Sequence, residues 1–139
     1  NENLILLGIP PTNPTLDPYL KRTNFYLTPE NDGIVSRAPK PGEPGIFRTA
    51  RTVAGSSAIA RHGLLVVLPG HGPNTSLILV MGLQTSAIAT FISAPPSIEN
   101  WTREWRKAGS PSHFEMVLLT QSDGVITKSA ECVAFRAIR

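Results

Sequence analysis

Two short segments of the sequence carry residue types that often contact a ligand. Each segment follows an apolar run and consists of a glycine, a polar turn and a residue suited to begin a helix. Backbone N–H groups are free at a helix start, so such loops favour a small anion or polar ligand. The candidate binding residues are Gly8, Thr12 and Asn13 in the first loop and Gly82, Thr85 and Ser86 in the second.

The spacing in both loops differs from the common phosphate-binding patterns. Neither loop has the glycine spacing of a P-loop or of a dinucleotide fingerprint, and no Lys-Ser/Thr pair follows. Pro10, Pro11 and Pro14 also remove N–H donors from the first loop. We therefore expect weak binding at most and no cofactor. The alternative interpretations are a structural turn for the first loop and helix capping for Thr85 and Ser86.

The sequence shows no arrangement typical of catalysis or metal binding. Its three histidines are far apart, and none has the spacing of a metal ligand. Cys132 lies in an apolar run, which favours packing over a role as nucleophile. Glu43 and Glu115 could form an acid–base pair, although no spacing requires it. We therefore expect no catalytic residue, no metal site and no intrinsic hydrolase or transferase activity.

Length and charge narrow the possible partners. The length of 139 residues suits a single domain. Hydrophobic residues make up 41% of the sequence and charged residues 17%. The net charge of +3 comes from scattered basic residues, so we expect no direct nucleic-acid binding. The apolar runs are too short for membrane insertion. The sequence does not begin with Met, so we expect residues 1–139 to be one domain cut from a longer protein, either cytoplasmic or extracytoplasmic.

Apolar runs and turn signals predict one α/β domain. We expect a single mixed sheet of about six or seven strands, with a parallel centre, antiparallel edges and about three helices, in a Rossmann-like or flavodoxin-like arrangement. Residues 25–36 form a predicted hairpin, residues 46–48 an edge strand, and residues 85–93 a helix. A further helix is expected to start with Ser97 as its cap and to pack through Trp101 and Trp105.

The continuous apolar runs predict strands that are buried on both faces. If the strands before the two candidate loops are parallel neighbours, both loops open onto one crevice at the same sheet edge. The predicted core residues are Ile5, Leu6, Leu7, Leu65, Val66, Val67, Ile78, Leu79 and Val80.

The order of several short motifs resembles that of a known family. The motifs are Leu-Ile-Leu-Leu-Gly-x-Pro-x-Thr-Asn-Pro at residues 4–14, the loop at 40–44, the apolar runs at 63–68 and 77–82, and the closing segments 114–119 and 133–136. Over nearly its whole length the chain is similar to the uncharacterised C-terminal α/β domain of acidobacterial regulatory proteins, which often carry a winged helix. A weaker resemblance is to Rossmann-like domains of archaeal surface-layer proteins. The first resemblance implies an accessory domain with no assigned activity.

Two classes of function follow from these observations. The first is a non-catalytic sensing or protein-interaction module of a bacterial regulatory protein, whose crevice holds few titratable groups. Its partner would be a small anion, another polar ligand or a protein. The alternative is an enzyme with a diverged nucleotide-type fold, or a structural surface-layer domain. Sheet topology and the polarity of the crevice separate the first class from an enzyme.

Overall fold

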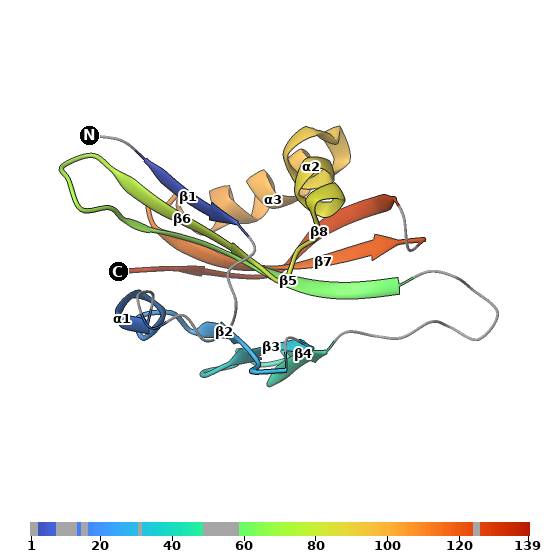
Figure 1. Ribbon diagram of the computed structural model, residues 1–139, viewed down its shortest axis with the longest axis horizontal. Coiled ribbons are helices and arrows are strands. Elements are labelled where there is room, and N and C mark those ends of the chain that lie inside the picture. The colour runs from blue at the N-terminus through green and yellow to red at the C-terminus, as the bar shows by residue number, and fades with distance from the viewer. Residues whose placement is uncertain (1–2, 8–13, 15–16, 31, 49–58, 124–125) are drawn as a thin grey trace.

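A computed structural model describes residues 3–7, 14, 17–30, 32–48, 59–123 and 126–139 (Figure 1). The larger sheet has the spatial order β1 (Leu4–Leu7), β6 (Ser76–Met81), β5 (Ile59–Pro69), β7 (Phe114–Ser122) and β8 (Thr127–Ala137). The smaller sheet has the order β2 (Phe25–Leu27), β3 (Gly33–Ser36) and β4 (Ile46–Arg48). The helices are α1 (Asp17–Leu20), α2 (Thr85–Ser93) and α3 (Pro95–Lys107). Figure 1 shows α2 and α3 on one side of the larger sheet and the smaller sheet on the other.

The larger sheet is parallel at one edge and antiparallel elsewhere. β1 and β6 run parallel, with Leu4 opposite Leu77 and Leu7 opposite Val80. The pairs β5–β6, β5–β7 and β7–β8 are all antiparallel. The predicted Rossmann-like or flavodoxin-like sheet with a parallel centre is therefore wrong. The reason is that β5 and β6 are joined by a short turn, whereas a parallel pair needs a long crossover connection.

Residues 25–48 form a separate sheet, which is a second correction to the prediction of one sheet. The hairpin of β2 and β3 and the edge strand β4 are confirmed, and both pairings are antiparallel. These strands pack face to face on the larger sheet, because Phe25, Ile34 and Phe47 bury their side chains in one cluster with residues of β5 and β6. That buried cluster requires two layers of strands, which local sequence patterns do not distinguish from one sheet.

Two cores lie on opposite faces of the larger sheet. The core between the sheets includes Leu64 and Leu79. The other core lies under the helices, where Phe91 packs with Met116 and where Trp101 and Trp105 contribute the predicted packing stripe. The predicted helix at residues 85–93 is confirmed. The next helix begins earlier than predicted, because its N-cap is Ala94 and Ser97 is buried within the first turn.

The predicted core is partly wrong at β1. Val66, Leu79 and Val80 are buried, but Ile5 and Leu7 are 57% and 58% exposed. The others in the predicted set, namely Leu6, Leu65, Val67 and Ile78, are half-buried. The physical reason is that α2 and α3 pack mainly over β8. β1 is at the opposite edge of the larger sheet from β8, so the two helices do not cover its side chains on the helix-bearing face.

Candidate functional site

The two predicted ligand loops follow the carboxyl ends of neighbouring strands of the larger sheet. This follows because β1 and β6 are parallel neighbours, as the matching sequence patterns suggested. Gly8, Thr12 and Asn13 lie outside the described residues. In the second loop, Gly82 has a φ of +72°, in the region that glycine adopts most readily. The shared crevice and its ligand therefore remain predictions.

The start of α2 differs from its predicted capping. The N-cap is Gln84, and Thr85 is the first helical residue. The Ser86 hydroxyl lies 3.0 Å from the Thr127 hydroxyl of β8, so it joins the helix to the sheet. The capping interpretation of Thr85 and Ser86 is therefore wrong, while their assignment as ligand contacts stays a prediction.

A cavity of about 350 Å³ lies beside the end of β6. Its apolar wall is formed by Leu20, Leu27 and Met81, and the Arg37 guanidinium lies 4.6 Å above the Tyr26 ring. Asp17 and Lys21 complete the lining. Neither Gly82 nor Ser86 belongs to this lining. The cavity therefore does not bring the predicted binding residues together.

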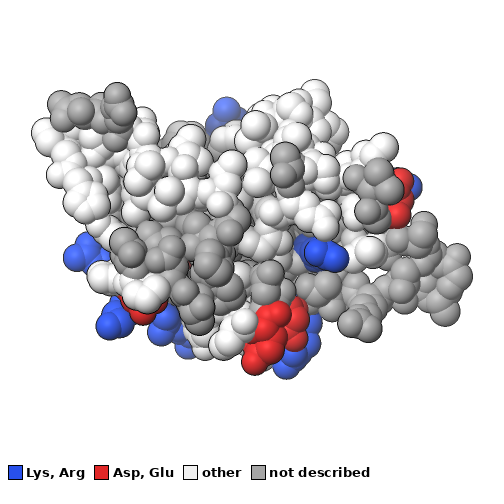
Figure 2. All heavy atoms as spheres, viewed as in Figure 1, with Lys and Arg blue, Asp and Glu red and all other residues white. Residues whose placement is uncertain are grey.

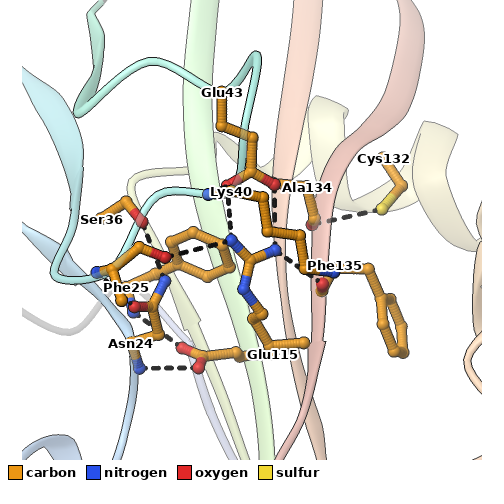
Figure 3. Close-up of polar contacts among 11 residues, drawn as sticks. Asn24, Phe25, Ser36, Lys40, Glu43, Glu115, Cys132, Ala134 and Phe135 are labelled. Atoms are coloured by element: carbon orange, nitrogen blue, oxygen red, sulfur yellow. Dashed lines mark hydrogen bonds and ion pairs between the residues drawn. The ribbon is translucent and has the colours of Figure 1, made fainter.

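Glu43 and Glu115 both lie beside Arg136, and these three residues form the carboxylate cluster. Figure 3 labels the two glutamates. Glu115, on β7, is 2% exposed and accepts hydrogen bonds from the backbone N–H groups of Asn24 at 2.7 Å and Phe25 at 2.9 Å. Arg136, on β8, donates from Nη1 to Glu43 Oε1 at 2.9 Å and also from Nη2 to Oε2. The sequence did not determine whether Glu43 and Glu115 lie close together, and the fold brings both beside Arg136.

The carboxylate cluster holds the two sheets together. Each of its four carboxylate oxygens has a hydrogen-bond donor from another part of the fold. The hydrogen bond from Arg136 lowers the pKa of Glu43, whereas burial raises the pKa of Glu115. Glu115 anchors the start of β2, and Glu43 ties the loop before β4 to β8. These contacts assign both carboxylates a structural role.

Cys132 lies beside a second cavity, of about 280 Å³. The thiol donates a hydrogen bond to the carbonyl of Ala134, with 3.4 Å between the two atoms. Burial, with a contribution from the Glu104 carboxylate, raises the pKa of the thiol to about 12. With this raised pKa the Cys132 side chain is protonated near neutral pH. It is therefore unreactive, because the thiolate is the nucleophilic form.

We expect Cys132 to react slowly with Ellman's reagent in the folded protein. At pH 8 a thiol of pKa about 12 carries roughly a thousandfold less thiolate than an ordinary cysteine. The measurement compares the reaction rate of the native chain with that of the chain unfolded in urea at the same pH. Similar rates in the two states would contradict the burial of this thiol.

The two edges of the larger sheet differ in how they are protected. At β8, Asn100 of α3 accepts a hydrogen bond from the Cys132 backbone N–H at 2.7 Å. Arg136 donates to the Phe135 carbonyl at 2.9 Å. Charged side chains surround the cavity along this strand, namely Lys40, Glu43, Glu104 and Lys107. Such side chains are the usual means by which proteins block an open sheet edge.

The β1 edge, meaning the outer side of Leu4–Leu7, has no comparable protection among the described residues. Leu4, Ile5 and Leu7 are each more than half exposed. Neither β1 nor its neighbour β6 contains a charged residue or a proline. In Figure 2 the described residues over β1 and β6, at the upper left, are drawn white. The β1 edge is therefore the candidate site that the structure adds.

Comparison with known proteins provides no relative for this chain, since no family model, curated protein or solved structure matches it. The resemblance to acidobacterial regulatory domains therefore stays a prediction from sequence. Within the described ranges, no three His, Cys, Asp or Glu residues are grouped so that they could hold a metal ion. None of the described helices is long and apolar enough to cross a membrane.

Proposed function

We propose that this domain is a protein-interaction module that binds a partner strand through the β1 edge. The observation that carries the proposal is the contrast between the two edges of the larger sheet. The β8 edge is occupied by Asn100 and Arg136, whereas the β1 edge presents exposed leucine and isoleucine side chains. An open apolar edge is the type of surface to which extended peptides add as a further strand.

Strand addition at this edge is favourable for two physical reasons. The added strand supplies hydrogen-bond partners for the outward backbone groups of β1. It also removes the exposed parts of Ile5 and Leu7 from water, at about 25 cal/mol for each Å² of apolar surface. A non-catalytic role agrees with the use of Glu43 and Glu115 in holding the sheets together. It also agrees with the accessory role in a bacterial regulatory protein that the sequence resemblance implies.

A peptide titration tests the proposed function. The probe is a synthetic peptide with four consecutive Val and Ile residues between lysines, added to dilute ¹⁵N-labelled protein. We expect chemical-shift changes in the backbone amides of β1 and β6. The Leu7→Lys variant should bind at least about tenfold more weakly, because strand addition would bury the new charge.

Val133→Lys is the matched control for this titration. Val133 is an exposed apolar residue on β8, at the protected edge of the same sheet. The control should bind the peptide as the unmodified chain does. Binding that Leu7→Lys leaves unchanged, shift changes centred on β8, or no binding at all would each refute the proposed function.

A further inference from the structure

We infer that the partner strand at the β1 edge is β1 of a second copy of this chain, paired antiparallel about a two-fold axis. This inference rests on the proposed function. Its starting point is that β1 is apolar on both faces of the sheet. The register with β6 places Leu4 and Leu6 on the face toward the smaller sheet, and Ile5 and Leu7 on the opposite face.

The apolar character of β1 limits which strand fits beside it. A neighbouring strand contributes side chains to both faces, so its residues must be uncharged and apolar on both faces as well. β1 itself meets this requirement. Of the other described edge strands, β8 contains Lys128 and Glu131 and β4 contains Arg48, so neither meets it. β2 has no charged residue, but its Phe25 N–H already donates a hydrogen bond to Glu115.

A two-fold axis at Leu6 gives a self-complementary register. Directly opposed residues of an antiparallel pair lie on the same face of the sheet. With Leu6 opposite Leu6 of the second copy, Ile5 of each copy lies opposite Leu7 of the other. Both of these pairs lie on the face that α2 and α3 leave uncovered, so one contact buries the exposed side chains of both copies.

The charge distribution permits this pairing. The chain carries a net charge of +3, but β1 and β6 contain no charged residue. Self-association at this edge therefore places no charged residues of these strands opposite each other. The contact between two four-residue strands is smaller than the standard interface of roughly 1,200–2,000 Å². We therefore expect a weak dimer whose population rises with protein concentration.

Sedimentation velocity over a range of protein concentrations tests the dimer. We expect the chain to shift from its 15.0 kDa monomer toward a species of twice that mass as concentration rises. Leu7→Lys should remain monomeric, and Val133→Lys should dimerise as the unmodified chain does. Leu7 is exposed, so its substitution should preserve the fold, which far-ultraviolet circular dichroism verifies.

Disulfide formation tests the register independently. In a Cys132→Ser background, a mixture of Ile5→Cys and Leu7→Cys chains should form a cross-linked dimer under mild oxidation. Either variant alone should cross-link much more slowly, because identical positions lie diagonally apart in this register. Equal cross-linking of the single variants would overturn the proposed register.

The outcomes separate this inference from the proposed function. A chain that stays monomeric at all concentrations overturns the self-pairing. If the synthetic peptide still binds that monomer at β1, the interaction function stands and only the identity of the partner strand is wrong. A dimer that persists in Leu7→Lys overturns the assignment of the contact to β1.

Discussion

Replacement of Leu79 by alanine is expected to lower the free energy of unfolding by about 2–5 kcal/mol. Leu79 lies on β6 and is completely buried in the core between the two sheets. Its cross-strand neighbours are Val66 on β5 and Leu6 on β1. The substitution removes buried methyl groups and leaves a cavity that paired strands on both sides can fill only partly.

Leu7→Ala is the matched control for this substitution, because it makes the same chemical change on the neighbouring strand. Leu7 is mostly exposed, so we expect a loss below about 1 kcal/mol. Urea unfolding followed by the fluorescence of Trp101 and Trp105 measures both values, at a protein concentration low enough to keep the chain monomeric. Equal losses would contradict the edge position of β1, and a stable Leu79→Ala chain would contradict the core.

The contrast between these two leucines shows what the sequence pattern left undetermined. Residues 4–7 and 77–80 have almost the same apolar composition, and both were predicted to lie in buried strands. Only the second run is enclosed, because the larger sheet continues to β5 on its far side. An apolar strand at the edge of a sheet has the same local sequence pattern as an apolar strand in the middle of a core.

The pairing of β1 with β6 could be predicted, but the division into two sheets could not. Matching patterns of apolar run, glycine and helix start indicated the parallel neighbours correctly. The division depends on distant contacts, above all that of Glu115 with the start of β2, about 90 residues earlier in the chain. The sequence indicated Glu115 only as one half of a possible acid–base pair with Glu43, and no local pattern indicated its role as an acceptor of backbone hydrogen bonds.

The candidate site was missed for a related reason. The signal at the β1 edge is the absence of any charge or proline in Leu4–Leu7. That absence also describes a central strand, so it indicates an open edge only after the neighbours of β1 are known. The assignment of Gly82 and Ser86 as ligand contacts stays a prediction, and in the structure the Ser86 hydroxyl contacts the Thr127 hydroxyl.

Glu115→Ala should also destabilise the protein strongly, by about 2–4 kcal/mol. The substitution leaves the buried backbone N–H group of Phe25 and the partly buried N–H group of Asn24 without their acceptor. Each buried donor without a partner costs about 1–3 kcal/mol. Part of that loss is offset, because burial of the carboxylate opposes its charge and raises its pKa. Urea unfolding at pH 7 measures the change, and a chain as stable as the unmodified one would contradict this anchoring of β2.

Glu115→Gln separates the charge of this side chain from its shape. The amide keeps one acceptor oxygen, so we expect a smaller loss than for alanine. Because burial raises the pKa of Glu115 in the folded state, the unfolded chain loses its proton first as pH rises. The stability advantage of Glu115 over glutamine should therefore be largest below about pH 4.5, the ordinary carboxyl pKa, and should decrease as pH rises through the folded pKa. Titrating groups that do not interact with Glu115 are common to both chains and cancel in the comparison. An advantage that instead grows with pH would show that the backbone hydrogen bonds to the carboxylate outweigh its burial.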